Sequence, residues 1–266
     1  MSDFTKAKDA FLDVVDEKNY IDLDNSINIY SSLKQAIEKP LKMIMLYGRP
    51  GTGKSMLLNR LYTELKHNHN IYNYPTPLVD EDYFLTTLAK DIYNIETDGI
   101  KITQFIEIAK ESSFETTPIV LLDEAQLYSD KLMEKIRLLS DSRYVKFVIT
   151  LHKTDEEDII AKEHFQTRIW ESVELHNGTV NDISIYIQKK LLQHSLTNVA
   201  LMFNIKIFKQ IHTLTKGNLR DTNKLLYTLF EIYEYYESHK PSKINLSSIN
   251  GDYITMSALA RGFING

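Results

Sequence analysis

A short stretch early in the chain has the residue types that bind phosphate. It fits the pattern Gly-x4-Gly-Lys-Ser/Thr and consists of Gly48-Arg49-Pro50-Gly51-Thr52-Gly53-Lys54-Ser55. Glycines let backbone N–H groups turn toward phosphate oxygens, and a helix start adds the positive end of a dipole. The Lys54 ammonium would contact the β- and γ-phosphates of a nucleotide, and the Ser55 hydroxyl would ligate Mg²⁺. The stretch therefore predicts a site for ATP or a similar triphosphate.

The residues on both sides place this loop where phosphate binding needs it. Residues 42–47 form an apolar run typical of a buried strand, and residues 56–65 have apolar positions at helical spacing. The predicted nucleotide-binding segment extends to Met56, in the first turn of that helix. A glycine loop of this pattern also arises by chance, and the strand before it and the helix after it argue against chance.

A second run that could do chemistry follows about 70 residues after the phosphate loop. Residues 119–122 are continuously apolar and are followed by Asp123 and Glu124. We expect this strand to lie beside the first one, with Asp123 holding Mg²⁺ through water and Glu124 deprotonating the attacking water. The alternative is a strand that enters a helix, because the first turn of a helix prefers acids.

Two polar residues mark the end of a further apolar run at residues 145–151. Thr150 and His152 lie where a group that senses the γ-phosphate would be expected, and both are also ordinary residues for a strand end. The sequence does not choose between them. We therefore count both as candidate nucleotide-binding residues.

Strand and helix patterns alternate over the first two thirds of the chain. Mostly apolar runs at 42–47, 71–74, 118–122 and 145–151 and an alternating stretch at 169–175 predict five strands. Helices are predicted between them at about 56–65, 83–94, 100–111 and 129–140. This alternation predicts an α/β fold with a five-stranded parallel sheet and ligands at the carboxyl ends of the strands. Helical patterns within residues 1–20 and at 29–37 precede the sheet.

The pattern becomes purely helical after Asn177-Gly178. We expect a nucleotide-binding domain over residues 1–178, a small helical domain over 179–240 and a tail over 241–266. The tail carries an amphipathic segment at 254–264, which either packs on its own domain or docks on another protein.

Composition excludes several classes of protein. With 43% hydrophobic and 25% charged residues the chain is typical of globular proteins, and the absence of cysteine excludes disulfides and thiolate metal sites. The apolar runs are too short for a membrane span, and the N-terminus shows no leader pattern. We therefore expect a cytoplasmic protein, and the alternative is a cytoplasmic protein attached peripherally to the inner membrane. The net charge of −5 argues against a globally basic nucleic-acid binder. Residues 179–266 carry 10 Lys and Arg against 6 Asp and Glu, which we interpret as a solvated surface.

The two nucleotide motifs are followed by a helical C-terminal part, and in this combination the chain resembles an AAA+ ATPase. It resembles most closely the ATPase domain of ExeA-type proteins of the bacterial general secretion pathway. The similarity extends from about Tyr20 to about Tyr236. Its most specific parts are Leu121-Leu122-Asp123-Glu124-Ala125-Gln126-Leu127, the run Glu134-Lys135-Ile136-Arg137-Leu138-Leu139-Ser140, the pair Arg168-Ile169, and Tyr186-Ile187 with Leu191.

The resemblance implies further site residues. Arg220, in Gly217-Asn218-Leu219-Arg220, would be the arginine of the helical domain that contacts the γ-phosphate in the same subunit. Arg168 would be a finger acting on the nucleotide of a neighbouring subunit, because a fixed guanidinium stabilises charge on the transferred phosphoryl group. Tyr20 and Ile21 would border the nucleotide. The chain departs from the family after the fourth strand, where it has Leu151-His152-Lys153-Thr154-Asp155, and this bears on the choice between Thr150 and His152.

The function implied by the resemblance is ATP hydrolysis with Mg²⁺, coupled to a conformational change or assembly that acts on a protein partner. That partner would be a membrane-associated component of a secretion, pilus or DNA-uptake system, and the chain itself would form a homo-oligomer. The alternative is a DNA-associated ATPase similar to transposition regulators or helicase loaders, which should gather Lys and Arg on one surface. A third alternative, a scaffold that binds nucleotide without turnover, is disfavoured by the presence of Lys54, Asp123 and Glu124.

Overall fold

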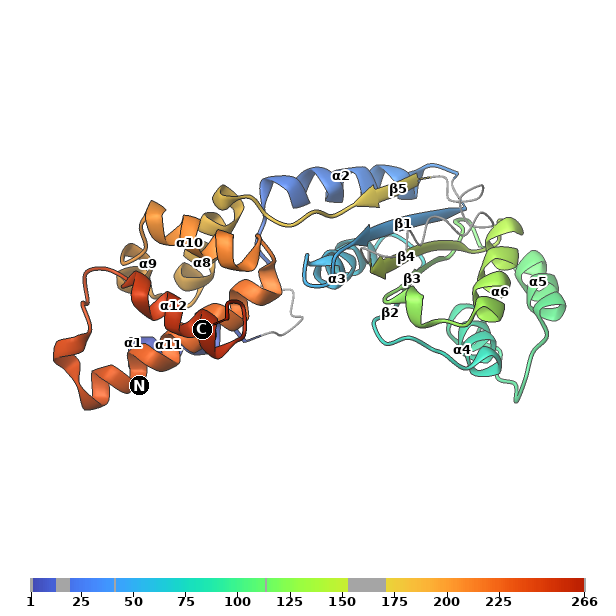
Figure 1. The fold of residues 1–266 in the computed structure, drawn as a ribbon. Helices are drawn as coiled ribbons and strands as arrows, with labels where there is room; N and C mark the ends of the chain where they lie inside the picture. The colour runs from blue at the N-terminus through green and yellow to red at the C-terminus, as the bar shows by residue number, and fades with distance from the viewer. Residues whose placement is uncertain (1, 13–19, 41, 113, 153–170, 266) are drawn as a thin grey trace. The chain divides into compact units, whose positions relative to one another are not determined.

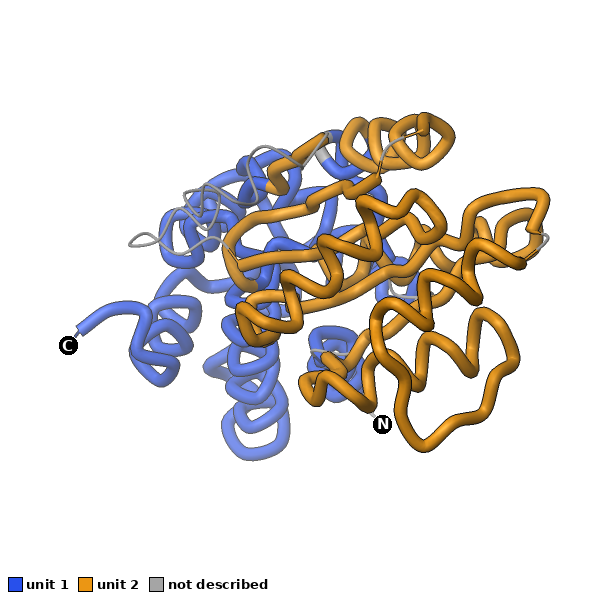
Figure 2. The backbone as a smooth tube through the Cα atoms, turned by 90° about the vertical axis from the view of Figure 1, so that its right-hand side faces the viewer, with its two compact units in different colours: residues 1–27, 51–53, 176–266 blue, residues 28–50, 54–175 orange. Residues whose placement is uncertain are grey.

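The structure is a computed structural model, and it describes residues 2–12, 20–40, 42–112, 114–152 and 171–265. Contacts divide the chain into two compact units (Figure 2). Unit 1 comprises residues 1–27, 51–53 and 176–266, and unit 2 comprises residues 28–50 and 54–175.

Unit 2 is built on a five-stranded sheet (Figure 1), and the predicted α/β fold with a parallel sheet is confirmed. Its strands are β1 (Met43–Gly48), β2 (Ile71–Tyr74), β3 (Ile119–Leu122), β4 (Lys146–His152) and β5 (Glu171–Glu174). They lie in the order β2-β3-β4-β1-β5, and every neighbouring pair is parallel.

The order of the strands corrects one expectation. We expected the strand before Asp123 to lie directly beside the strand before the phosphate loop, but β4 lies between β1 and β3. The reason is that each parallel pair needs a long crossover connection, so a strand that comes later in the chain can enter between two earlier ones. The carboxyl ends of all three strands still meet at one edge of the sheet.

Apolar residues cover both faces of this sheet, as a parallel sheet requires. The helices of unit 2 are most of α2 (Asp24–Glu38) and all of α3 (Lys54–Leu65), α4 (Glu81–Tyr93), α5 (Ile102–Glu111) and α6 (Asp130–Asp141). Side chains of α4, α5 and α6 share one core with alternate strand residues, among them Met45, Leu122 and Ile149. The strand residues between them point to the opposite face and are equally buried.

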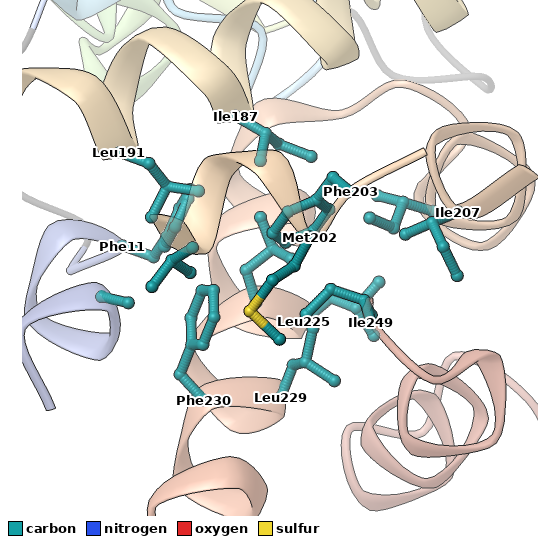
Figure 3. Close-up of a cluster of buried hydrophobic side chains, with 14 of the residues drawn as sticks. Phe11, Ile187, Leu191, Met202, Phe203, Ile207, Leu225, Leu229, Phe230 and Ile249 are labelled. Atoms are coloured by element: carbon teal, nitrogen blue, oxygen red, sulfur yellow. The ribbon is translucent and has the colours of Figure 1, made fainter. Parts of the chain in front are cut away.

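Unit 1 is helical (Figure 3). It contains α1 (Asp3–Ala10), α8 (Val180–Gln193), α9 (Thr197–Leu201), α10 (Ile205–Thr215), α11 (Leu219–His239) and α12 (Gly251–Ala260). Its core gathers Phe11 from the N-terminal segment, Ile187 and Leu191 from α8, and Leu225, Leu229 and Phe230 from α11. The structure therefore differs from the expected division, because the N-terminal helix belongs with the C-terminal helices.

The packing of α1 on α11 joins the two ends of the chain. The rings of Phe4 and Tyr233 lie 5.0 Å apart, and those of Phe11 and Phe230 lie 5.8 Å apart. The Lys8 ammonium lies 2.7 Å from a carboxylate oxygen of Glu234. The tail also packs on this unit, since α12 buries Ile254 and Ala258 in the same core.

Among the residues that the structure describes, none of the helices is both long enough and apolar enough to cross a membrane.

Candidate active site

The phosphate loop connects β1 to α3, as predicted from the flanking patterns. β1 ends at Gly48 and α3 begins at Lys54. Gly51 has φ +81° and Gly53 has φ +101°, which is left-handed backbone that side chains with a Cβ rarely adopt. Both glycines are thus required by the conformation of the loop, which turns the chain sharply between strand and helix.

Lys54 lies inside this turn, and its side chain is only 5% exposed. Its ammonium donates hydrogen bonds to the backbone carbonyls of Gly48, at 2.8 Å, and Arg49, at 2.9 Å. A buried ammonium needs such partners, because removal from water is costly without them. Ser55 and Met56 follow in the first turn of α3, and both are partly buried.

The acidic pair follows β3 at the same edge of the sheet. In the strand register, Gly48 at the end of β1 is level with His152 of β4, and Leu122 of β3 is level with Ile149. Asp123 is 5% exposed, whereas the Glu124 side chain is 40% exposed. Glu124 has φ +51°, an uncommon conformation for a residue with a side chain, and such strained positions cluster at functional sites.

Thr150 connects the two acids from the neighbouring strand. Its hydroxyl donates a short hydrogen bond to Oδ1 of Asp123 and accepts one from the backbone N–H of Glu124 at 3.0 Å. Thr150 is fully buried. It therefore holds the acidic pair in place, a role that the sequence did not indicate; its role toward a γ-phosphate stays a prediction.

His152 is partly exposed at the end of β4. Its Nε2 lies 3.6 Å from Oε1 of Glu124, and its Nδ1 lies 3.2 Å from Nε2 of Gln126. Gln126 is a further residue that the sequence analysis did not assign to the site. The one signal for it was its place in the run Asp-Glu-Ala-Gln.

Two tyrosines near the acidic pair stay protonated at neutral pH. Burial and a hydrogen bond that it donates to Asp91 raise the pKa of Tyr74 far above its usual range. Burial, with a smaller effect of Asp123, raises the pKa of Tyr128 to about 12. Neither phenol is therefore ionised at neutral pH.

The remaining predicted site residues belong to unit 1 or lie outside the described residues. Ile21 is buried in the core of unit 1, and Tyr20 beside it is partly buried. Arg220 is exposed at the second position of α11, and its backbone N–H donates to the carbonyl of Gly51 at 3.4 Å within unit 1. Arg168 lies outside the described residues. The roles of these four residues stay predictions.

The donor set fits Mg²⁺ bound together with a nucleotide. In the described part of the chain no three His, Asp or Glu side chains form a cage for a metal ion. Mg²⁺ usually keeps several waters and takes few ligands from the protein, with phosphate oxygens completing its shell. The Ser55 hydroxyl and the Asp123 carboxylate are groups of that kind and would be its ligands.

Comparison with known proteins places this site in a class. Residues 38–159, which include the phosphate loop, the acidic pair and His152, match the family model described as "AAA domain". No curated protein matches the sequence.

The fold is shared with solved structures. Cdc6p from Pyrobaculum aerophilum is 14% identical, with a TM-score of 0.63, and the alignment covers 97% of this chain and 72% of that one. The ORC2 protein of Aeropyrum pernix, solved with ADPNP and ADP, is 13% identical, with a TM-score of 0.60 and coverage of 94% and 70%. The ORC1 protein of Aeropyrum pernix in complex with DNA is 14% identical, with a TM-score of 0.59 and coverage of 96% and 69%.

At such low identities the structural likeness shows the fold alone. Together with the domain match over residues 38–159 and the sheet order, it defines an AAA+ P-loop fold.

Proposed function

We propose that the chain is an ATP-driven switch, which binds ATP with Mg²⁺ and couples its hydrolysis to conformational change or assembly. The single observation that carries the proposal is the common edge of the sheet, where Lys54 and the pair Asp123 and Glu124 follow parallel strands. Lys54 and Ser55 would bind the phosphates and the metal ion, with Asp123 as the second metal ligand. When bound, Mg²⁺ neutralises negative charge on the phosphate oxygens.

Glu124 is the proposed base. Its carboxylate is accessible, whereas that of Asp123 is buried against Thr150, so Glu124 is the acid able to accept a proton from water. The backbone of Glu124 is held by Thr150 and its side chain lies near His152. A base held in one position contributes about 10²–10⁴-fold to a hydrolysis rate.

The finer proposal concerns the partner. From the resemblance to ExeA-type proteins, we infer that the switch acts on a membrane-associated protein of a secretion, pilus or DNA-uptake system. Arg220 would contact the γ-phosphate within one subunit, and Arg168 would act on the nucleotide of the next, which makes a homo-oligomer part of the proposal.

A second candidate function is a DNA-associated ATPase. The observation that favours it is the likeness of the fold to ORC1, which was solved in complex with DNA, and to Cdc6p. Residues 179–266 carry 10 basic against 6 acidic residues, a modest excess of positive charge. DNA binding of this electrostatic kind weakens steeply as salt rises.

ATP turnover with and without duplex DNA tests both candidates. We expect wild type to hydrolyse ATP, and Glu124→Gln to bind ATP but hydrolyse it at least about 100-fold more slowly. The control is Glu107→Gln, at an exposed residue of α5, and its rate should equal that of wild type. Turnover that survives in Glu124→Gln would remove Glu124 as the base. Strong stimulation of wild type by DNA at low salt, lost at high salt, would establish the second candidate over the first.

A further inference from the structure

The ring of His152 lies between two side chains that follow β3. On one side, its Nε2 is 3.6 Å from Oε1 of Glu124. On the other side, Gln126 contacts it twice: the amide nitrogen lies 3.2 Å from Nδ1, and the amide oxygen accepts the backbone N–H of His152 at 3.2 Å. The side chain of His152 is 25% exposed.

These two contacts of Gln126 determine which ring nitrogen carries the proton. A backbone N–H is always a donor, so the atom of the Gln126 amide that faces it must be the oxygen. The nitrogen of the same amide then faces Nδ1, and an amide nitrogen can only donate. Nδ1 is therefore an acceptor, and the single proton of the neutral imidazole is on Nε2.

The same contacts disfavour a protonated ring. In the imidazolium form both ring nitrogens are donors, so Nδ1–H would point at the N–H of Gln126. Two donors facing each other gain no hydrogen bond. In the neutral ring, the contact of Gln126 with Nδ1 thus leaves the proton on Nε2, on the side of Glu124.

We propose that His152 is a positioning residue for Glu124, and that Gln126 sets its tautomer for this purpose. The inference rests on the proposed role of Glu124 as the base. At 3.6 Å the contact is too long for a hydrogen bond, and a small rotation of either side chain closes it. Nε2–H then holds Oε1 and leaves Oε2 to accept the proton of water. His152 keeps its own proton throughout, so the water proton ends on Glu124.

A positioning role predicts a distinct kinetic pattern. His152 would act after ATP is bound, so its loss lowers kcat and leaves KM nearly unchanged. A histidine that merely ends a strand would instead change stability, with no selective effect on kcat. A substitution of His152 that keeps an N–H donor should therefore preserve ATP turnover.

The first experiment reads the tautomer directly by long-range ¹⁵N–¹H NMR of protein labelled at histidine. We expect His152 of wild type to be protonated at Nε2. Gln126→Glu replaces the amide donor by a carboxylate acceptor, so the proton should move to Nδ1 or the ring should become cationic. Gln35→Glu, an exposed glutamine of α2, is the matched control and should leave the signal of His152 unchanged. Protonation of wild type at Nδ1 would overturn the proposal.

The second experiment measures kcat and KM for ATP in variants whose folding is verified by thermal melting. His152→Leu, which removes the N–H donor, should lower kcat by about tenfold or more, with KM within about twofold. His152→Gln, which keeps an N–H donor of similar reach, should retain most of the turnover. Unchanged kcat in His152→Leu would contradict the proposal.

The two proposals fail in different ways. If wild type turns over ATP, Glu124→Gln abolishes it and the His152 variants are normal, only the positioning role is wrong. If wild type shows no turnover, the proposed function is wrong and the positioning role falls with it.

Discussion

Thr150 is the residue on which the geometry of the acidic pair depends. One hydroxyl contacts both Asp123 and the backbone of Glu124, and it does so in a fully buried position. Each hydroxyl has a single proton to donate, so the donor is used on Asp123 and the lone pairs remain for Glu124. The strained backbone of Glu124 is thereby held from the neighbouring strand.

Thr150→Val tests this role because valine has nearly the same shape and no hydroxyl. Oδ1 of Asp123 loses the hydroxyl donor, and the backbone N–H of Glu124 keeps only its other acceptor, Oδ1 of Asp123 at 3.0 Å. The loss costs about 1–3 kcal/mol of unfolding free energy. We expect ATP turnover to fall as well, since Glu124 is no longer held. Urea denaturation and an ATPase assay measure the two effects.

The matched control is Thr213→Val, at an exposed threonine of α10 whose hydroxyl bonds within its own helix. It should change stability by no more than about 0.5 kcal/mol. A Thr150 variant as stable and active as this control would show that the hydroxyl does not organise the site.

At the scale of elements, α1 and α11 bring distant parts of the chain into contact. Glu234 accepts a hydrogen bond from Thr5 at 2.6 Å and pairs with Lys8 at 2.7 Å. The hydrogen bonds from Lys8 and Thr5 lower the pKa of Glu234, and the same pair raises the pKa of Lys8. The charged forms of both groups are thus favoured in the folded protein.

The direction of these shifts predicts how stability depends on pH. A lowered carboxylate pKa stabilises the fold above its usual value of 4.5, and this contribution is lost as pH falls through the folded-state pKa. A raised lysine pKa stabilises below 10.5, and this contribution is lost as pH rises through its folded-state value. Glu234→Gln should therefore be less stable than wild type at neutral pH by up to about 1 kcal/mol, and the difference should vanish in acid.

Urea denaturation at neutral and acidic pH measures this dependence. Glu231→Gln, an exposed residue one turn earlier on α11, is the control and should show a much smaller difference. A deficit of Glu234→Gln that persists unchanged in acid would mean that packing, and not the ion pair, explains it.

At the scale of the whole molecule, the proposed finger Arg168 predicts that subunits share their active sites. Arg168→Ala and Glu124→Gln should each lower turnover by at least about 100-fold, since a finger and a base contribute that much or more. When the two variants are mixed, a mixed oligomer contains one intact site, made of Glu124 from one subunit and Arg168 from the other. Turnover of the mixture should therefore exceed the sum of its components.

A mixture of Lys54→Ala with Glu124→Gln is the control for this experiment. Each site takes its own Lys54 and its own Glu124 from one chain, and a neighbouring subunit supplies neither. Every site in that mixture therefore lacks either the lysine or the base. The mixture should show no gain. If the Arg168→Ala mixture also shows none, Arg168 does not act on a neighbouring subunit.

The sequence by itself determined the parts of the protein that depend on local pattern. The phosphate loop between strand and helix, the five strands and the acids after β3 were all predicted from spacing and periodicity, because these reflect which face of an element is buried. The short helix α9 was not predicted, since five residues contain too little of a period to detect.

Only the tertiary structure decided which of these elements meet. It placed β4 between β1 and β3, brought Thr150 to the acidic pair and Gln126 to His152, and packed α1 on a helix more than 200 residues later. Periodicity shows that a face is buried but not what buries it, because many elements offer similar apolar faces. The choice among them depends on crossover connections and on the fit of the whole core, which no local stretch of sequence contains.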